Sequence, residues 1–300
     1  MLNIHIFIKK FLIIIIFFWE FISFKFVFAT INITNNIKNN IINIIHTNDI
    51  HGNFESIWNN NNNLETIGLD IIKNLKDNLP NSILVDAGDA TQESAICLLD
   101  QESVINLMNE TEYDIRVPGN HDFDFNVNQV IINAKKSNCP VLAANVLDKD
   151  NIPILNGINK NNGENYIINI NGHKLGFFGL VTTETVIITP PEDILDIKFE
   201  DEIKIAKEQV KKLKKLGVDI IIAVTHMGVA SSNICTSEKL AQEVDGIDII
   251  IDGHSHTVMS KKINNTVIQQ TGVNSHNYES EFLVSNFCDM KNINIILNNK

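Results

Sequence analysis

The segment VPGNHDFDF, residues 117–125, places an amide, an imidazole and two carboxylates within five consecutive positions, directly after a short apolar run. These polar residues are Asn120, His121, Asp122 and Asp124. Taken alone, the segment is compatible with a polar turn, because Gly, Asn and Asp are typical turn residues. Its meaning depends on where the other polar side chains of the chain lie.

Four other predicted strands also end in polar residues, in the motifs HTNDIHG, DAGD, THMG and DGHSHT. The candidate side chains are Asp49 and His51 after the first strand, Asp89 after the second, Asn120, His121, Asp122 and Asp124 after the third, His226 after the fourth, and His254 and His256 after the fifth. Open α/β sheets build their sites at the carboxyl ends of their strands. We therefore expect these side chains to lie close together.

Short β-branched runs alternate with helical stretches from residue 41 onward. Several runs are continuously apolar, which is typical of strands that are covered on both faces. The predicted strands are residues 41–46, 82–87, 114–117, 141–146, 166–170, 174–181, 219–226, 248–253 and 266–271. The predicted helices are residues 64–79, 94–110 and 200–217, and Asn171-Gly172 predicts a hairpin. The pattern predicts an α/β domain of mixed sheets with covering helices.

The number of histidines favours metal ligands over turns. A single Asp-Gly, or a single His after a strand, is usually a turn or a surface residue. Turn chemistry does not require five imidazoles, however, and only His5, His46, His173 and His276 remain to be interpreted as structural or exposed. Nitrogen and oxygen donors without a thiolate indicate Zn²⁺, Mn²⁺, Fe²⁺, Mg²⁺ or Ca²⁺. Because the donors are too many for one ion, we expect two divalent ions, about 3.5–4 Å apart, that share a carboxylate.

The composition restricts the partners of the protein. The chain has 300 residues, a net charge of −12 and a single arginine, Arg116. A nucleic acid polymer is therefore not an expected partner, because clusters of Lys and Arg bind phosphate backbones. A small phosphate ester would have to be held by something other than guanidinium groups, and bound cations are suited to this.

The first 29 residues have the layout of a secretory signal peptide: Lys9 and Lys10, an apolar run over residues 11–19, and a Val-Phe-Ala ending. We expect residues 1–29 to be cleaved and the protein to be exported, to the periplasm or outside the cell. An uncleaved membrane anchor and a buried helix are the alternatives. Residues 30–40 are rich in Asn and predict a linker. The four cysteines are far apart; most are interpreted as small buried residues, and disulfides formed after export, whose pairing the sequence does not assign, are the alternative.

The five motifs, in this order and at these separations, resemble the sequence blocks of the calcineurin-like metallophosphoesterases. They look most like the branch that contains 5′-nucleotidases, UDP-sugar hydrolases and 2′,3′-cyclic phosphodiesterases. The stretches LMNETEYD, VLAANV, GFFGLVTTET and VIQQTG are similar to that branch as well, so the resemblance covers residues 42–272. It implies an α/β fold with four layers, an αββα sandwich of two mixed sheets flanked by helices.

The resemblance also implies a role for each candidate residue. The first divalent metal ion would be held by Asp49, His51, Asp89 and His256, and the second by Asp89, Asn120, His226 and His254. His121 would stand over the phosphorus, and Asp124 would orient that imidazole and favour its protonated form. A hydroxide, formed from water whose pKa the ions lower, would attack in line. Asp122 stands where this branch more often has Glu, and we expect it to lie behind the ligands with little effect.

The branch normally carries a second, carboxyl-terminal domain that binds the nucleoside, and residues 41–300 are expected to be the catalytic domain only. The resemblance implies a hydrolase that acts on phosphate monoesters, as 5′-nucleotidases do, or on cyclic diesters of small nucleotides. One alternative is hydrolysis of sugar phosphates or UDP-sugars. Another is a metal-binding chain that is inactive, or that depends on a partner chain to supply the substrate domain.

Overall fold

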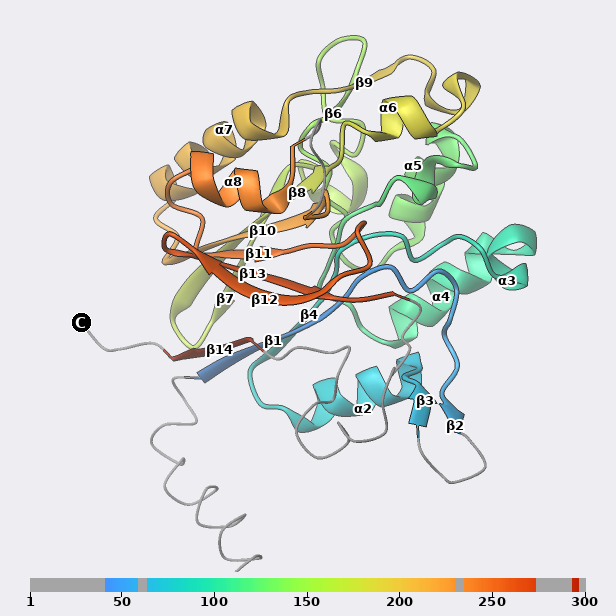
Figure 1. Ribbon diagram of the computed structural model, residues 1–300, viewed down its shortest axis with the longest axis horizontal. Helices are drawn as coiled ribbons and strands as arrows, with labels where there is room; N and C mark the ends of the chain where they lie inside the picture. The colour runs from blue at the N-terminus through green and yellow to red at the C-terminus, as the bar shows by residue number, and fades with distance from the viewer. Residues whose placement is uncertain (1–40, 59–63, 230–234, 274–292, 297–300) are drawn as a thin grey trace, which may run out of the picture. The chain divides into compact units, whose positions relative to one another are not determined.

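The computed structural model describes residues 41–58, 64–229, 235–273 and 293–296 (Figure 1). The predicted signal peptide, residues 1–29, and the predicted linker, residues 30–40, lie outside these ranges. Among the described residues, no helix has the length and apolar character needed to cross a membrane.

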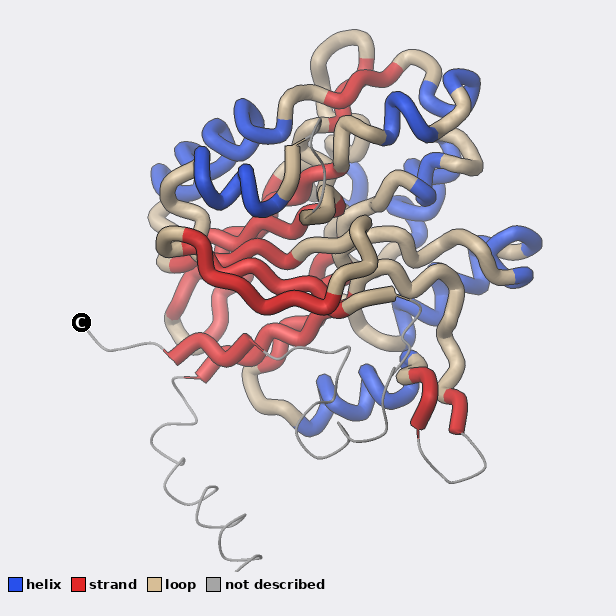
Figure 2. The backbone as a smooth tube through the Cα atoms, in the orientation of Figure 1, coloured by secondary structure: helices blue, strands red, loops and turns tan. Residues whose placement is uncertain are grey.

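Contacts divide the chain into two units, residues 1–41 with 295–300, and residues 42–294. The apolar core and the candidate site both belong to the second unit. Within this unit, strands and helices alternate along the chain. Figure 2 shows the strands in red, the helices in blue and the loops in tan. The α/β class predicted from the sequence is confirmed.

The larger sheet has six strands in the order β12-β13-β11-β10-β8-β7. They are β7 (Asn165–Ile170), β8 (His173–Val181), β10 (Ile220–His226), β11 (Ile249–Ile251), β12 (Val258–Ile263) and β13 (Thr266–Thr271). The four inner strands are parallel, whereas β7 and β12 run antiparallel to their neighbours at the two edges. The predicted hairpin joins β7 to β8, because Asn171 and Gly172 adopt φ angles of 51° and 82°, as a type I′ turn requires.

The smaller sheet has the order β14-β1-β4-β5. Its strands are β1 (Ile41–Thr47), β4 (Ser82–Asp86), β5 (Ile115–Arg116) and β14 (Ile293–Ile296). Strand β4 pairs in parallel with β1 on one side and with β5 on the other. Two antiparallel ribbons complete the described strands: β2 (Ile57–Trp58) with β3 (Leu64–Thr66), and β6 (Val146–Asp148) with β9 (Ile197–Phe199).

The helices cover the outer faces of the two sheets. They are α2 (Leu69–Asn78), α3 (Ala95–Leu99), α4 (Gln101–Glu110), α5 (Val127–Lys136), α6 (Thr185–Ile188), α7 (Glu202–Lys215) and α8 (Ser237–Glu243), with short 3₁₀ turns η2 (His121–Phe123), η3 (Ile158–Lys160) and η4 (Pro191–Ile194). Helices α7 and α8 contact the larger sheet, and α2 contacts β4 of the smaller one (Figure 1).

Burial of alternate residues shows that each sheet is covered on both faces. Phe178 of β8 belongs to an apolar cluster with Leu213 of α7, whereas its neighbour Phe177 points to the opposite face and is also fully buried. In the smaller sheet, Leu84 packs in the cluster that contains α2 and α4, and Val85 is buried on the other face. Two sheets that are each buried between helices and the other sheet form the αββα sandwich that the family resemblance implied.

Helix α7 illustrates how local sequence sets an element. The carboxylate of Asp201 accepts a hydrogen bond from the backbone N–H of Lys204 (2.7 Å), which caps the amino end. Gly217, with φ of 69°, follows the last turn in a conformation that favours glycine. The predicted helix over residues 200–217 is confirmed, with observed limits just inside the predicted ones.

The predicted strand over residues 141–146 is confirmed only at its ends: Val141 forms an isolated parallel bridge with Arg116, and β6 begins at Val146. The backbone N–H of Leu142 donates to the carbonyl of Arg116 in β5 (2.9 Å), and that of Ala144 donates to Gly179 in β8 (2.9 Å). The segment thus passes between the two sheets. Its apolar character reflects burial and not strand geometry, a distinction that periodicity does not make for short runs.

Two predicted helices are only partly correct. The segment over residues 64–79 begins with β3, and α2 starts at Leu69. The segment over residues 94–110 is divided into α3 and α4 at Asp100, whose backbone leaves the helical region (φ −154°, ψ 77°). The Asp100 carboxylate accepts a hydrogen bond from the N–H of Ser103 (3.1 Å), so a side-chain cap starts a new helix there. Strand β12 was not predicted, because its residues are mostly exposed.

Replacing Phe178 by Ala should lower the free energy of unfolding by about 3–5 kcal/mol, because the substitution leaves a cavity between β8 and α7. Urea denaturation of the metal-free protein, followed by circular dichroism, measures the change. Leu216→Ala is the control, since Leu216 is 54% exposed, and it should change the free energy by no more than about 0.5 kcal/mol. Equal losses in the two variants would contradict this placement of the core.

Candidate metal centre

The predicted site residues all lie at the carboxyl ends of strands (Figure 1). Asp49 and His51 follow β1, Asp89 follows β4, Asn120 to Asp124 follow β5, His226 ends β10, and His254 and His256 follow β11. The ends of parallel strands meet at one edge of each sheet. The two edges are joined directly, because the backbone N–H of His254 donates to the carboxylate of Asp49 (3.0 Å).

One group of potential ligand atoms combines Asp49, His51 and His256, which all lie within 4.8 Å of one another. The Nε2 atoms of His51 and His256 are 3.2 Å apart. Oδ1 of Asp49 lies 3.5 Å from Nε2 of His256 and 3.9 Å from Nε2 of His51. His51 and Asp49 are buried, whereas 44% of the His256 side chain is exposed, so this group is open to solvent on one side.

A second group combines Asp49, Asp89 and His226, and all three are buried. Nε2 of His226 lies 2.9 Å from Oδ2 of Asp89 and 3.8 Å from Oδ1 of Asp49. Nδ1 of His226 donates to the carbonyl of Ala87 (2.7 Å), because a carbonyl can only accept. Oδ2 of Asp89 is also 4.0 Å from Nε2 of His51, so Asp89 lies between the two groups.

Asn120 and His254 extend the second group. Nδ1 of His254 lies 2.8 Å from Oδ1 of Asn120, and the rings of His226 and His254 are 5.3 Å apart. The turn that carries Asn120 is tied to Asp89, since the next backbone N–H, that of His121, donates to Oδ1 of Asp89 (2.9 Å). The structure thus brings all seven predicted ligands to one place.

The turns that carry these side chains adopt a backbone conformation that most residues avoid. The φ angle is positive at Asp49 (49°), His51 (49°), Asp89 (56°), His254 (80°) and His256 (54°). Such conformations cost of order 1–3 kcal/mol each and persist where the surroundings hold them, typically at functional sites. Because five of the seven predicted ligands share this feature, these side chains are placed by their turns and not by regular strands.

Asp122 supports these turns. Its carboxylate accepts hydrogen bonds from the backbone N–H groups of Gly119 (2.7 Å) and Asp89 (3.2 Å) and from the hydroxyl of Thr91. Burial raises the pKa of Asp122, and the neighbouring Asp89 raises it further. The sequence predicted a residue behind the ligands with little effect, and the geometry gives it a defined supporting contact.

The donor set fits divalent cations. Two imidazole nitrogens face each other at 3.2 Å beside the carboxylate of Asp49, and the buried Nε2 atom of His226 lies 2.9 Å from the carboxylate of Asp89 and 3.8 Å from that of Asp49. Buried polar atoms are normally hydrogen-bonded, and converging lone pairs require a positive charge between them. Imidazole and carboxylate donors without a thiolate suit Zn²⁺, Mn²⁺ or a similar ion.

The charges at the centre shift one another's pKa. Burial alone would raise the pKa of Asp89, but the positive charge and hydrogen bond of His226 lower it well below its usual range. Burial alone would lower the pKa of His226, but Asp89 and Asp49 raise it to about 10. These shifts report concentrated negative charge, which a bound cation would neutralise.

His121 and Asp124 form a hydrogen-bonded pair beside the ligands, with Nδ1 of His121 2.7 Å from Oδ2 of Asp124. Burial acts to lower the pKa of His121, but Asp89 and Asp124 together outweigh this effect, so that the net pKa lies above its ordinary value. The His121 side chain is 36% exposed, whereas its backbone N–H is bonded to Asp89. The imidazole is therefore accessible to a ligand from solvent while its backbone is held at the centre.

Two polar residues of the site were not predicted from the sequence. Oε2 of Glu184 lies 2.7 Å from Nε2 of His254, and Nδ2 of Asn48 donates to Oδ2 of Asp49 (2.6 Å). Both residues lie in motifs that were singled out, GFFGLVTTET and HTNDIHG. The sequence contains the same signal for Asn48 and Glu184 as for the predicted site residues, since each is a polar residue just beyond the carboxyl end of a strand.

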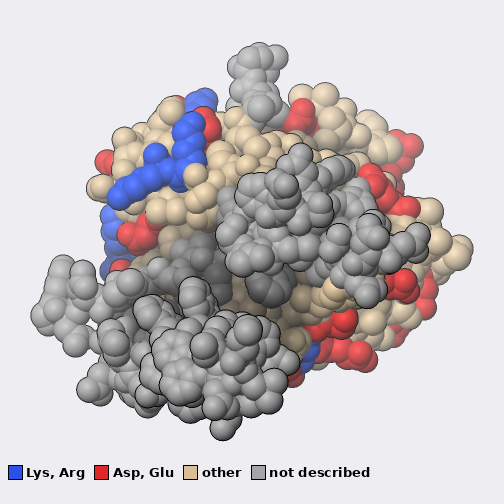
Figure 3. Space-filling view, turned by 60° about the horizontal axis from the view of Figure 1, so that its bottom comes forward, with Lys and Arg blue, Asp and Glu red and all other residues tan. Residues whose placement is uncertain are grey.

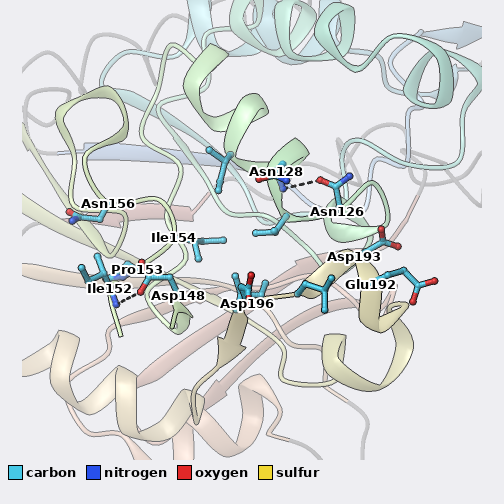
Figure 4. A pocket seen from close by; sticks show the side chains of 14 residues that line it. Asn126, Asn128, Asp148, Ile152, Pro153, Ile154, Asn156, Glu192, Asp193 and Asp196 are labelled. Atoms are coloured by element: carbon cyan, nitrogen blue, oxygen red, sulfur yellow. Dashed lines mark hydrogen bonds between the residues drawn. The ribbon is translucent and has the colours of Figure 1, made fainter. Parts of the chain in front are cut away.

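A cavity of about 680 Å³ lies apart from this centre, between the start of α5 and the β6–β9 ribbon (Figure 4). Its lining includes four acidic residues, Asp148, Glu192, Asp193 and Asp196, around several apolar side chains. None of the nine predicted site residues lines it.

Figure 3 shows a face on which acidic side chains lie in several separate places and basic side chains gather towards one edge.

Comparison with known proteins is consistent with this geometry. The family model of calcineurin-like phosphoesterases matches residues 42–258, a range that contains all five motifs. The chain belongs to the calcineurin-like phosphoesterase family.

Named relatives and solved structures agree with this membership. The chain is 31% identical over 228 residues to a snake venom 5′-nucleotidase of Naja atra, which covers 72% of this chain and 41% of that protein. It is 29% identical over 227 residues to a 5′-nucleotidase of Mus musculus, which covers 72% of this chain and 38% of that protein. A 5′-nucleotidase precursor from Thermus thermophilus has the same fold, with a TM-score of 0.68 and 23% identity over 78% of this chain and 49% of its own. The chain spans less than half the length of each of these proteins.

Gly119→Ala should weaken the binding of added Zn²⁺ or Mn²⁺ at least about ten-fold, the lower end of the loss expected when a ligand's support is disturbed. A Cβ atom at residue 119 would lie 2.0 Å from Oδ1 of Asp89 and would displace that carboxylate. Isothermal titration of the metal-free protein measures the affinity. Gly217→Ala is the control, because no atom lies within 4 Å of a Cβ added at residue 217. Equal affinities for both variants would contradict this role of Asp89.

Proposed function

We propose that the protein hydrolyses phosphate esters of small nucleotides with two divalent metal ions as cofactors. The observation that carries this proposal is the convergence of seven nitrogen and oxygen donors from five strand ends beside the His121–Asp124 pair. A cation site accounts for the converging lone pairs, and an accessible imidazole with a carboxylate partner is typical of acid–base catalysis. The family of the chain supports the same chemistry.

The two ions would share the ligands as the family resemblance implies. The first would be held by Asp49, His51, Asp89 and His256, and the second by Asp89, Asn120, His226 and His254. The position of Asp89 supports a bridging role, because its Oδ2 atom lies 2.9 Å from Nε2 of His226 and 4.0 Å from Nε2 of His51. When bound, the ions supply Lewis-acid polarisation of the phosphoryl group and lower the pKa of water at the site.

The chain needs this positive charge because its only arginine is not available to a substrate. Arg116 is buried, its Nη1 atom donates to the hydroxyl of Ser137 (2.9 Å), and its Nε atom lies 3.6 Å from Asp86. A phosphate group at the centre therefore cannot be clamped by a guanidinium group of this chain. The proposed metal ions and the protonated His121 would supply positive charge to it instead.

His121 acts on the substrate through Nε2, because its Nδ1 atom is engaged by Asp124. The raised pKa of His121, which arises from Asp89 and Asp124 against the effect of burial, favours the imidazolium form. That form stabilises negative charge on the phosphoryl group and can donate its Nε2 proton to the leaving-group oxygen. Asp124 holds the ring orientation that this transfer requires.

Nucleotide monoesters are the first substrates to test, because relatives that share this domain are named 5′-nucleotidases. Cyclic nucleotide diesters, UDP-sugars and sugar phosphates present the same phosphoryl chemistry to the centre. A partner chain that supplies a substrate domain is compatible with a chain that spans 41% of the Naja atra relative.

We also propose that the protein is exported. Lys9 and Lys10, the apolar run over residues 11–19 and the Val-Phe-Ala ending support cleavage near residue 29. One of the relatives is a venom protein, which fits a secreted setting. Three cysteines among the described residues, Cys97, Cys139 and Cys235, are free and buried, and so they behave as small core residues.

Hydrolysis of a small substrate panel by the purified protein, with added Mn²⁺ or Zn²⁺, tests the proposed activity. The panel contains 5′-AMP, 2′,3′-cyclic AMP, UDP-glucose and an aryl phosphate. We expect turnover of 5′-AMP or the cyclic diester, and its loss when a chelator removes the ions. No turnover of any substrate by folded, metal-loaded protein would contradict an independent enzyme and leave the partner-dependent or inactive alternative.

His121→Ala should lower kcat by about 10²–10⁴-fold, the contribution expected of a general acid, while both ions remain bound. His173→Ala is the control, because His173 begins β8 at the end opposite to the site and should leave kcat unchanged. Steady-state kinetics and metal analysis of both variants measure the effects. An unchanged rate for His121→Ala would contradict the role given to His121.

Asp89→Ala should remove both ions, because the Asp89 carboxylate lies close to His51 of the first proposed ligand set and to His226 of the second. Metal analysis by plasma mass spectrometry after gel filtration measures the stoichiometry, and circular dichroism checks the fold. Retention of one ion at wild-type affinity would show that Asp89 does not bridge.

A further inference from the structure

We propose that Glu184 is a positioning residue of the metal centre, whose hydrogen bond to His254 selects the ring nitrogen with which His254 binds the second ion. The inference rests on the ligand set proposed above and adds a residue to it. Glu184 is not one of the nine residues that the sequence motifs indicated. It approaches the centre from the end of β8, a strand that contributes none of those nine residues.

The two nitrogens of His254 face two different acceptors. Nδ1 lies 2.8 Å from Oδ1 of Asn120, and Nε2 lies 2.7 Å from Oε2 of Glu184. An imidazole that binds a metal ion is neutral, with one N–H and one lone pair, and a carboxylate without a proton can only accept. In the metal-binding form of His254, the N–H therefore lies on Nε2 against Glu184, and Nδ1 offers its lone pair on the side of the Asn120 oxygen. Nδ1 and Oδ1 of Asn120, which lie 2.8 Å apart, can then bind one cation together.

The segment that carries Glu184 is itself tied to the centre. The backbone N–H of Glu184 donates to the hydroxyl of Thr182 (3.1 Å), and the backbone N–H of Thr182 donates to the carbonyl of His226 (3.0 Å). The next N–H, that of Thr183, donates to the buried carboxylate of Glu202 at the start of α7 (2.7 Å). The backbone of Glu184 is thus held beside the centre by hydrogen bonds that do not involve its carboxylate, and the contact with His254 orients the side chain.

The other imidazole proposed to bind the second ion, that of His226, is also oriented by a hydrogen bond from its second ring nitrogen. His226 donates from Nδ1 to the carbonyl of Ala87 (2.7 Å), which leaves Nε2 for the metal. His254 uses the opposite assignment, with Nε2 as the donor and Nδ1 for the metal. The acceptor differs as well, since a carboxylate strengthens the basicity of its imidazole more than a neutral carbonyl does. Loss of such a partner typically costs about 10–100-fold in metal affinity.

Glu93 provides a matched control for charge without a hydrogen bond. Its Oε1 atom lies 3.9 Å from Nδ1 of His51, beyond hydrogen-bond distance, and its side chain is 53% exposed. Glu93→Gln therefore removes one negative charge beside a site imidazole and leaves the orientation of that imidazole unchanged. Glu184→Gln removes the same charge but retains an amide oxygen that can accept from Nε2, whereas Glu184→Ala removes the acceptor altogether.

Stepwise titration of the metal-free full-length protein with Zn²⁺, in competition with a chromophoric chelator, measures the two affinities. We expect Glu184→Ala to weaken one binding step about 10–100-fold and to leave the other within about three-fold. Glu184→Gln should lose clearly less than Glu184→Ala, and Glu93→Gln should change neither step by more than about three-fold. Equal losses in all three variants would assign the effect to charge alone and overturn the proposal.

The tautomer of His254 provides a readout that does not depend on turnover. Long-range ¹H–¹⁵N correlation spectra of the metal-free protein should show the proton on Nε2 in the wild type, and a mixture of tautomers in Glu184→Ala. If the wild type binds two ions and Glu184→Ala binds both equally tightly, the role of Glu184 is wrong and the proposed function stands. If the wild type binds fewer than two ions, the proposed metal centre fails, and the inference fails with it.

Discussion

The buried carboxylate of Asp89 is the interaction on which the rest of the site depends. One oxygen accepts the backbone N–H of His121, and the other lies 2.9 Å from the ring of His226, so two strands from different sheets are held through a single side chain. Burying an ionised group is costly unless several partners surround it. The glycine at residue 119 and the carboxylate of Asp122 support Asp89 in two ways: one leaves space for it, and the other orders its backbone.

The candidate metal centre also lies where the two sheets meet. Asn48, at the end of β1, bonds to Asp49 on one side, and to the backbone of Thr271 and Gly272 at the end of β13 on the other. The backbone N–H of His254, which follows β11 of the larger sheet, donates to the carboxylate of Asp49, which follows β1 of the smaller sheet. The residues that hold the sheets together at this edge are therefore the residues that position the ligands. Strained turns can persist here because hydrogen bonds from both sheets determine their conformation.

Much of this arrangement could be predicted from the sequence, because polar residues after apolar strands converge whatever the details of the sheet. The convergence of Asp49 with Asp89, which follow neighbouring strands β1 and β4 of one sheet, is of this kind, whereas the approach of His226 depends on how the two sheets pack. Residues 141–146 could not be predicted correctly, since an apolar run that passes between two sheets has the same composition as a buried strand. Glu184 was missed for a different reason. Its position just beyond the end of β8 was the one signal, but a lone carboxylate among threonines forms no spaced motif, and the 2.7 Å contact with His254 is what relates it to the site.

The two attachments of His121 separate the proposed metal binding from the proposed proton transfer within one turn. Its backbone N–H donates to the carboxylate of Asp89, one of the candidate ligands. Its imidazole ring pairs with Asp124 on the exposed side of the site. Replacing the ring leaves the backbone bond in place, so the ligands keep their positions. Altering Asp89 changes both the position of the turn and the pKa of His121, because the Asp89 carboxylate accepts the backbone N–H of the turn and raises the pKa of the imidazole. The turn thus couples the charge of the centre to the proton on His121 without making His121 a ligand.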